Sequence, residues 1–469
     1  MLEDSESIGP AELDRLFARC FADHPPGRFA LAVSGGSDST ALMVLMAEWI
    51  SQKIDQAGRS LDACTVLTVD HRLRPESAAE AEAVARQAAA LGFRHATLVW
   101  DGDKPRTSLQ AAARAARYRL MAAYARAHGI GTLCTAHTQD DQAETLLMRL
   151  ARGSGLDGLS AMAPIGPLPN SVSIDGDRLF IARPLLEVSK ARLQAILRRR
   201  GIGWIEDPSN ASPAFERVRL RAARAALDSL GLTPAMLALS ARRLQQARIA
   251  LDRWVADVLD PAAGTVEVHA CGCISIDRNR LGALPEEIVV RLLARAMGAA
   301  GGVGEPVPLA GLEAIAREVL DGHATGAWTL ARAKVTASPG RLLVEREPGR
   351  EALPVLSLTP GTAALWDGRF RLTVGARWAD AVEVRALGVE GLRELRARME
   401  IPADIPVGSL RAVPSFSRGD RLLAVPPLGF WADEHAHAQL SATFVGLAMP
   451  GSDPSAQRSG QTTSDGEGV

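Results

Sequence analysis

Residues 29–39 decide the fold and read Phe29-Ala30-Leu31-Ala32-Val33-Ser34-Gly35-Gly36-Ser37-Asp38-Ser39. The first five residues form a short apolar run, which is typical of a buried strand. The next six are small or polar, and a helical pattern begins at about Thr40. A strand that runs through a glycine-rich turn directly into a helix aims backbone N–H groups at an anion in the turn. The sequence therefore predicts a phosphate-binding loop at Ser34 to Ser39.

Outward from this loop, strand-like and helix-like patterns alternate, as they do in a doubly wound α/β domain. Further strands are predicted over 64–69, 96–100 and 131–135, and helices over 40–50, 76–91 and 108–128. Because the strands are apolar over nearly their whole length, we expect a parallel sheet that is buried on both faces. Ligands of such sheets bind beyond the carboxyl ends of the strands. Polar clusters begin at three of these ends, so we expect one shared site formed by 34–39, 70–74 and 135–144.

The loop lacks the lysine of a Walker loop and the spacing of a dinucleotide-binding motif. It resembles the PP-loop of the ATP pyrophosphatases, which split ATP into AMP and pyrophosphate. A flexible Gly/Ser turn that caps the following helix is the alternative. The resemblance implies that Asp38 helps to hold Mg²⁺ and that the pyrophosphate part of ATP is bound by Ser34, Gly35, Gly36, Ser37, Asp38 and Ser39.

The cluster after the fourth strand reads Thr135-Ala136-His137-Thr138-Gln139-Asp140-Asp141-Gln142-Ala143-Glu144-Thr145. On a helix that starts near Gln139, Asp141 and Glu144 share one face because they are three residues apart. Two carboxylates in this arrangement can bind an ammonium group. Alternatively, acidic residues in a first helical turn simply complement the helix dipole. The residues by themselves leave both interpretations open.

This cluster, together with Arg152-Gly153-Ser154-Gly155, resembles the signature of the tRNA(Ile)-lysidine synthetases. Other elements of that family are similar to residues 113–118, 183–186 and 204–210, and the likeness extends over about residues 28–225. Two positions depart from the family pattern. Arg72 stands where the family usually has Gly, and Val218 stands where it usually has Asn.

The resemblance implies a ligase of tRNA processing with an α/β fold of the adenine nucleotide alpha hydrolase type. ATP would adenylate C2 of the wobble cytidine in an isoleucine tRNA with a CAU anticodon. Free lysine would then displace AMP to form lysidine, which changes decoding from AUG to AUA. The implied cofactors are ATP and Mg²⁺, with Asp141 and Glu144 as the lysine-binding pair and Arg114 and His137 at the adenylate. The implied catalytic residues are Asp38, Arg114, His137, Asp141 and Glu144.

Two other functions are alternatives to a ligase, and features of the sequence disfavour both. A PP-loop tRNA thiolase needs cysteine pairs to carry sulfur or an iron–sulfur cluster, and the sequence contains no Cys-x-x-Cys. Its five cysteines are scattered, which is typical of reduced intracellular thiols, and Cys271-Gly272-Cys273 is expected to be a strand or turn. A catalytically inactive RNA-binding relative is disfavoured by the complete loop and the intact carboxylate pair.

The chain of 469 residues is long enough for two or three domains. We expect a catalytic domain over 1–212, a helical tRNA-binding domain over 213–325, a small α+β domain over 326–449 and a disordered tail over 450–469. Basic and acidic residues number 53 and 54, so RNA binding must come from local patches such as the arginines between residues 198 and 248. We predict a cytoplasmic protein without membrane contact, and the oligomeric state stays open.

Overall fold

The chain divides into two compact units, Met1–Ala250 (unit 1) and Leu251–Val469 (unit 2). The predicted tail at 450–469 and the predicted domain boundary at residue 212 lie outside the described residues. The division into three domains therefore stays a prediction. The computed structural model describes residues 7–21, 28–57, 61–102, 104–105, 107, 109–168, 179–206, 216–304, 306–321, 325–347, 349, 352–401 and 405–447.

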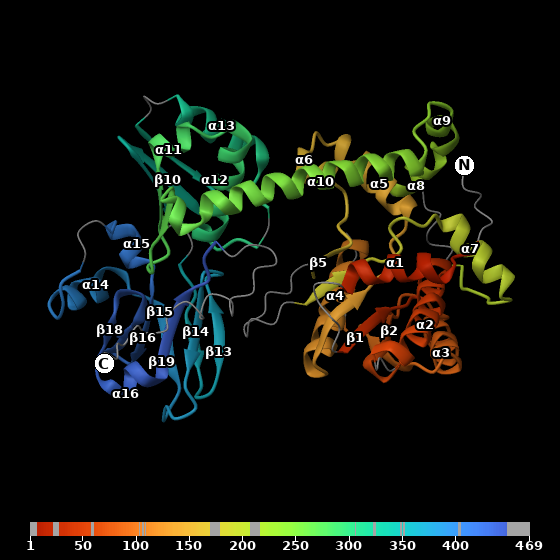
Figure 1. Ribbon diagram of the computed structural model, residues 1–469. Helices are drawn as coiled ribbons and strands as arrows, with labels where there is room; N and C mark the ends of the chain where they lie inside the picture. Colours follow the sequence, from red (N-terminus) through yellow and green to blue (C-terminus); the bar gives the residue numbers. More distant parts are fainter. Residues whose placement is uncertain are drawn as a thin grey trace, which may run out of the picture. The chain divides into compact units, whose positions relative to one another are not determined.

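Unit 1 is built on a six-stranded sheet with the strand order β3-β2-β1-β4-β6-β5. Figure 1 labels β1, β2 and β5 of this sheet. All neighbouring strands are parallel except β5, which runs antiparallel to β6. The four strands expected from the sequence are confirmed, and each lies within two residues of its predicted bounds. The strands are β1 (Arg28–Ala32), β2 (Cys64–Asp70), β3 (Arg94–Val99), β4 (Ile130–Cys134), β5 (Ile165–Pro167) and β6 (Phe180–Ala182).

Helices cover both faces of this sheet, which confirms the doubly wound fold. Successive side chains of β1 point to opposite faces. Leu31 packs in the core formed with α1, α2, α3 and α7, whereas Ala30 packs in a second core with α4. These helices are α1 (Pro10–Phe21), α2 (Ser37–Ala57), α3 (Ser77–Ala90), α4 (Leu109–Ala127) and α7 (Lys190–Arg199).

The remaining helices of unit 1 follow the strands β4 and β6 in the sequence. The first of them, α5, begins at Gln139 as predicted. The last, α10, continues past residue 250 into unit 2. The helices are α5 (Gln139–Leu150), α6 (Leu156–Leu159), α8 (Glu216–Ala222), α9 (Arg224–Ser229) and α10 (Pro234–Leu259), and a short 3-10 turn, η1 (Leu61–Ala63), precedes β2.

Unit 2 begins with an antiparallel sheet in the order β7-β8-β11-β10-β9, which packs against α12 and α13. The sequence predicted a helical domain over 213–325, and the strands β7 and β8 depart from that helical pattern. Both strands are short and alternate in a two-residue period, which the longer helical pattern around them obscured. The elements are η3 (Pro261–Ala263), β7 (Val266–Val268), β8 (Ile274–Asp277), α11 (Arg278–Gly282), α12 (Glu286–Gly301), α13 (Leu309–Leu320), β9 (Gly326–Leu330), β10 (Ala333–Ser338) and β11 (Arg341–Arg346).

The rest of unit 2 contains two further sheets, β12-β15-β16-β17-β18 and β13-β14-β19. The predicted β-rich character of this region is confirmed. Its elements are β12 (Leu356–Leu358), β13 (Ala363–Trp366), β14 (Phe370–Val374), β15 (Val382–Ala386), α14 (Gly388–Arg396), α15 (Val407–Arg411), β16 (Pro414–Arg418), β17 (Arg421–Val425), η4 (Pro426–Leu428), β18 (Phe430–Trp431), α16 (Glu434–Gln439) and β19 (Leu440–Phe444).

Two further sequence expectations concern cysteines and membrane spans. All five cysteines are free and buried. Cys271 and Cys273 lie in the turn between β7 and β8, with their Sγ atoms 3.3 Å apart, as the expected strand or turn requires. Across the described part of the chain, no helix combines the length and the apolar character that a membrane span needs.

Candidate active site

The predicted phosphate-binding loop connects β1 to α2 at the carboxyl edge of the unit 1 sheet. Gly35 has a φ of +86°, and a Cβ atom there would lie only 2.6 Å from Cδ1 of Ile205. The position therefore requires glycine twice over, for its backbone angle and for space. Within the loop, Ser39 Oγ accepts a hydrogen bond from the Ser34 N–H at 3.2 Å and donates one to Gly36 O at 3.0 Å. The loop thus has a defined shape at the N-terminus of a 21-residue helix, where an anion is stabilised.

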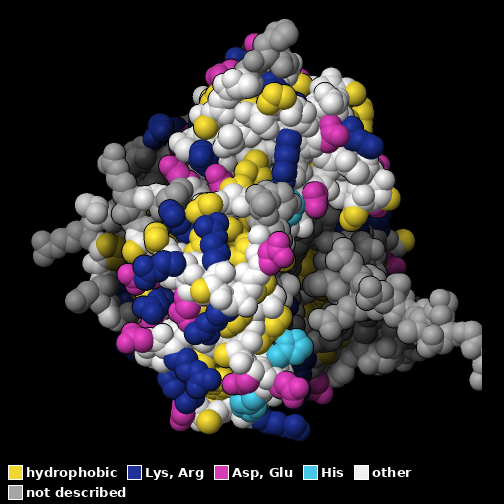
Figure 2. All heavy atoms as spheres, turned by 90° about the vertical axis from the view of Figure 1, so that its left-hand side faces the viewer, with side chains coloured by type: hydrophobic (Ala, Val, Ile, Leu, Met, Phe, Trp, Pro, Cys, Tyr) yellow, Lys and Arg dark blue, Asp and Glu magenta, His cyan; other side chains and the backbone are white. Residues whose placement is uncertain are grey.

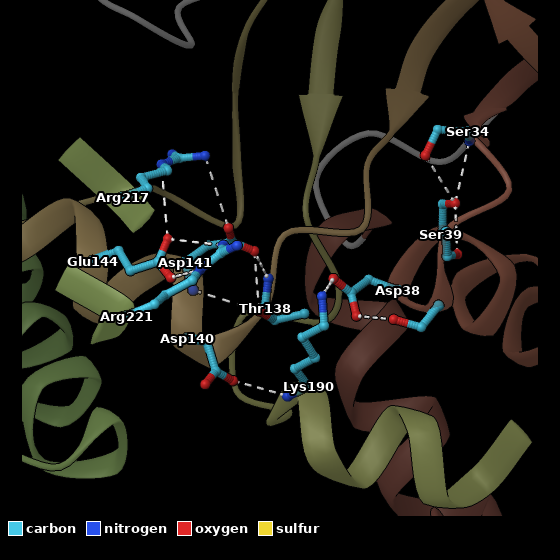
Figure 3. A network of polar contacts seen from close by, with 12 residues as sticks. Ser34, Asp38, Ser39, Thr138, Asp140, Asp141, Glu144, Lys190, Arg217 and Arg221 are labelled. Atoms are coloured by element: carbon cyan, nitrogen blue, oxygen red, sulfur yellow. Dashed lines mark hydrogen bonds and ion pairs between the residues drawn. The ribbon is translucent and has the colours of Figure 1, made fainter. Parts of the chain in front are cut away.

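Asp38 lies in the first turn of α2, and its side chain faces Lys190 at the start of α7 (Figure 3). Lys190 Nζ is 3.4 Å from Asp38 Oδ2, and Ser37 Oγ donates to Asp38 Oδ1 at 3.1 Å. Burial raises the pKa of Asp38 above its usual value, and the charge of Lys190 acts in the opposite direction. Asp141 also raises this pKa, which shows that the two carboxylates act on one another.

A metal ion at Asp38 would need ligands from the substrate as well as from the protein. Within the described ranges, no group of three or more His, Cys, Asp and Glu side chains could hold a metal ion. Mg²⁺, however, is usually bound by one or two carboxylates together with substrate phosphates. Asp38, at the phosphate-binding loop and near Asp141, fits that mode.

The helix α5 begins with a reciprocal capping arrangement between Thr138 and Asp141. Asp141 Oδ2 accepts hydrogen bonds from the Thr138 N–H at 2.9 Å and from the Thr138 hydroxyl at 3.0 Å, and the Asp141 N–H donates to Thr138 Oγ1 at 3.4 Å. Such a box satisfies backbone donors at a helix start. The interpretation that Asp141 serves the helix start is therefore correct for Oδ2. Its other oxygen, Oδ1, lies 4.0 Å from Nη1 of Arg217.

Glu144 follows one turn later on the same face of α5, and only 9% of its side chain is exposed. Arg221 binds it with two nitrogens, Nε to Oε1 at 2.6 Å and Nη2 to Oε2 at 3.2 Å. Arg217 Nε lies 3.8 Å from Oε2. Both arginines project from α8 (Figure 3). The hydrogen bonds to Glu144 raise the pKa of Arg221, so the guanidinium keeps its charge.

These groups surround a small cavity of about 180 Å³. Asp140 joins them, because its Oδ2 accepts a hydrogen bond from the Lys190 N–H at 2.8 Å and its Oδ1 lies 3.5 Å from Arg224 Nη1. Carboxylates thus meet cations of the same chain throughout the cavity wall. The lining residues are Asp38, Thr138, Asp140, Asp141, Glu144, Lys190, Arg221 and Arg224.

His137 lies next to this cavity, in the connection between β4 and α5. Its Nδ1 is 2.9 Å from Thr135 Oγ1. Burial lowers the pKa of His137 to about 4, while Asp141 acts in the opposite direction and Arg183 and Arg114 act with burial. The ring is therefore neutral at neutral pH. Arg114 is on α4, with its guanidinium carbon 5.1 Å from the ring centroid of Tyr118.

The second predicted cluster lies at the end of β2 and includes Arg72 in place of the family's Gly. Arg72 has a φ of +51°, in the left-handed region that favours glycine. Its N–H donates to Asp70 Oδ1 at 2.8 Å, and its side chain pairs with Asp101 at 2.5 Å on the surface. Burial lowers the pKa of the neighbouring His71 to about 4.

The sequence did not assign three of the cavity residues to this site. Lys190 stands in no motif, and only its place after the helix-capping Ser189 distinguishes it. Arg221 and Arg224 were grouped with the arginines expected to bind RNA. Each of the three forms an ion pair with a carboxylate that is distant in the sequence. Arg224 has a second ion pair, with Asp228, which is only four residues away. Only that last contact, at a spacing of four residues, carries a sequence signal.

Comparisons with known proteins include the part of the chain that forms this site and extend beyond it. A family described as a PP-loop domain matches residues 10–225. The chain is 46% identical over 322 residues to a tRNA(Ile)-lysidine synthase of Bradyrhizobium sp. (strain BTAi1), which covers 67% of this chain and 84% of that protein. For the enzyme of Bradyrhizobium diazoefficiens the identity is 41% over 370 residues, covering 74% and 97%. For that of Ruegeria pomeroyi it is 38% over 427 residues, covering 90% and 94%.

Proposed function

Because this chain belongs to the tRNA(Ile)-lysidine synthase family, we infer that it is an ATP-dependent ligase that attaches lysine to C2 of the wobble cytidine in a CAU-anticodon isoleucine tRNA. The product, lysidine, changes decoding from AUG to AUA. One observation carries this inference beyond the family likeness. The complete phosphate-binding loop and the carboxylates Asp141 and Glu144 lie at one edge of the sheet, where Asp38 and Glu144 line the same cavity.

In the first step, the cytidine oxygen attacks the α-phosphate of ATP, and pyrophosphate leaves. We propose that residues 34–39 hold the departing phosphates with the N-terminus of α2, where the helix dipole and backbone donors oppose the growing negative charge. Asp38 would hold Mg²⁺, which when bound neutralises charge on the phosphate oxygens. The rigid shape of the loop supports this role, because donors that are already in place need no rearrangement during the reaction.

In the second step, the lysine amine forms a bond to C2 and AMP leaves. The amine must lose a proton before it can attack, so a nearby carboxylate as acceptor is chemically sensible. We propose that Asp141 and Glu144 bind the lysine and orient its amine. Oδ1 of Asp141 is not used in the helix cap. Glu144 itself is buried, but its partner Arg221 has a side chain that is 47% exposed, so a ligand can approach this ion pair from the side of the arginine.

Arg114 and His137 would serve the adenylated base. A neutral imidazole can accept or donate a hydrogen bond without adding charge, and the low pKa of His137 keeps it in that form. The guanidinium of Arg114 is permanently charged and suits a phosphate oxygen. The two residues are close enough to interact, since the charge of Arg114 lowers the pKa of His137.

Contact with the rest of the tRNA would come from basic surfaces. Figure 2 shows Lys and Arg side chains spread over the face turned toward the viewer, with hydrophobic side chains between them. In unit 2, exposed arginines include Arg393 and Arg396 on α14 and Arg411 on α15. Such side chains can neutralise backbone phosphates of RNA. Because its substrates are tRNA, ATP and free lysine, we propose a cytoplasmic location.

The test is direct. The protein is incubated with ATP, Mg²⁺, isotope-labelled lysine and a CAU-anticodon isoleucine tRNA transcript, and the nucleosides are analysed by mass spectrometry. We expect one labelled lysidine per tRNA and equal amounts of AMP and pyrophosphate. The variant Asp38→Ala should lose at least about 100-fold in rate, the scale on which removal of one charge-stabilising group acts. Wild-type protein that transfers no lysine would refute the proposed function, and an Asp38→Ala variant with full activity would refute the role of that carboxylate.

A further inference from the structure

Arg183 has no assigned role, although it lies at the carboxyl edge of the same sheet. It follows β6 directly, and β6 pairs in parallel with β4. The Thr135 N–H donates to Ala182 O at 2.9 Å, which joins the ends of these two strands. The Arg183 N–H in turn donates to Pro164 O at 2.7 Å. The backbone of Arg183 is therefore fixed beside the segment that carries His137.

The guanidinium of Arg183 is poorly compensated. Nη1 donates to Ala163 O at 2.9 Å, whereas Nε is buried and has no hydrogen-bond partner. No Asp or Glu side chain in the described ranges forms an ion pair with it. Burial lowers the pKa of Arg183, and the cations Arg114 and Arg149 act in the same direction. Since arginine stays protonated in proteins, this position holds an uncompensated charge.

Such a charge is costly unless an anion arrives to neutralise it. The neighbours of Arg183 indicate where that anion would bind. The charges of Arg183 and Arg114 both lower the pKa of His137, so Arg183 lies close to the residues proposed to contact the adenylated base. The phosphate-binding loop is at the end of β1, two strands away in the order β1-β4-β6. At about 4.8 Å per strand this is roughly 10 Å, so the backbone of Arg183 is separated by two strand spacings from the loop proposed to hold the pyrophosphate.

We propose that Arg183 is a phosphate-binding residue of this site, with a phosphodiester of the RNA next to the target cytidine as its favoured ligand. This inference rests on the proposed function, which supplies the RNA. A phosphate oxygen would compensate the charge of the planar guanidinium, which matches phosphate geometry. The α-phosphate of ATP offers the same chemistry, so the experiment treats the two sources separately.

The experiment measures binding without lysine transfer. Arg183→Gln, Arg183→Lys and wild-type protein are titrated with the tRNA transcript at several salt concentrations and, separately, with ATP. Arg86→Gln is the matched control, because Arg86 is an exposed arginine of α3 whose only described carboxylate contact is Glu82 at 3.8 Å. We expect Arg183→Gln to weaken tRNA binding about tenfold and to lower the salt slope by about one. The variant Arg183→Lys should keep part of the affinity that Arg183→Gln loses, and the control Arg86→Gln should change little.

A stability measurement separates this role from a structural one. Removal of an uncompensated, partly buried charge should leave the thermal midpoint of the ligand-free protein unchanged or raise it. Weaker binding of the tRNA supports the RNA as the source of the phosphate, and weaker binding of ATP alone supports the nucleotide. Unchanged binding of both, or a loss that follows only from a lowered midpoint, overturns the proposal. Because neither titration needs product formation, a failure of the proposed function would appear separately, as absent lysine transfer by the wild type.

Discussion

Two clusters of carboxylate and guanidinium groups in this molecule look alike in composition and differ in exposure. In unit 1, Glu144 meets Arg221 and Arg217, whose side chains are 47% and 40% exposed. In unit 2, Asp367 is fully buried and accepts hydrogen bonds from three arginines, Arg332 at 2.6 Å, Arg346 at 2.9 Å and Arg369 at 2.7 Å. Arg332 is 47% exposed, whereas Arg346 and Arg369 are 5% and 1% exposed.

The two clusters differ in whether their charged groups can exchange one partner for another. Burial by itself would raise the pKa of Asp367, but the hydrogen bonds and charges of Arg346 and Arg369 outweigh it and leave the pKa low. Arg369 also donates to Ala412 O at 2.6 Å, so the unit 2 cluster is satisfied internally. The unit 1 cluster opens on a cavity and its arginines reach solvent. Identical chemical groups thus stabilise a fold in one place and remain available to a ligand in the other.

The largest effect is expected from Asp367→Asn. Asparagine tolerates the positive φ of 51° at this position, so the change removes charge without new backbone strain. Two buried arginines would lose their counter-charge, and we expect a loss of about 3–5 kcal/mol in the free energy of unfolding. Denaturant unfolding of the full chain, with hydrogen exchange of peptides from β13 and β14, measures it. Asp228→Asn is the control, because that carboxylate is exposed. A loss below about 1 kcal/mol would show that the two clusters do not differ.

An intermediate effect is expected from Glu144→Gln. The loss of one charge-assisted contact, about 1.5–3 kcal/mol, should raise the KM for lysine roughly ten- to hundredfold and leave ATP binding unchanged. Glu216→Gln is a matched control, since Glu216 also pairs with an arginine, Arg152, but does not line the cavity. Steady-state kinetics with varied lysine and separate ATP titrations decide the matter. A variant that loses ATP binding and keeps its KM for lysine would contradict the assignment.

The smallest effect is expected from Arg221→Gln on stability. Because the arginine is half-exposed and Arg217 remains 3.8 Å from Glu144, the free energy of unfolding should change by less than about 1 kcal/mol. The corresponding variant in unit 2, Arg346→Gln, should cost several times more, since both Arg346 and its partner Asp367 are buried, whereas Arg221 is half-exposed. Equal losses in the two variants would mean that the unit 1 pair is as structural as the other.

Much of unit 1 could be predicted because its signals are local. The apolar run of β1 and the glycines after it specify a strand, a turn and a helix through backbone chemistry alone. The start of α5 at Gln139 and the shared face of Asp141 and Glu144 follow from helical geometry in the same way. The short strands β7 and β8 were missed because a two-residue period over three or four residues is a weak signal beside long helices.

The sequence by itself determined the doubly wound architecture, the phosphate-binding loop and the carboxylates of α5. Only the tertiary structure decided that Lys190 faces Asp38, that Arg221 holds Glu144, and that Arg183 stands without a carboxylate. The physical reason is range. A glycine turn or a helix face is set within a few residues, whereas an ion pair depends on where the sheet brings together side chains that are 77 residues apart, as for Arg221 and Glu144. The sequence alone does not distinguish an arginine that pairs with a carboxylate, such as Arg221, from one that we propose to bind a phosphate, such as Arg183.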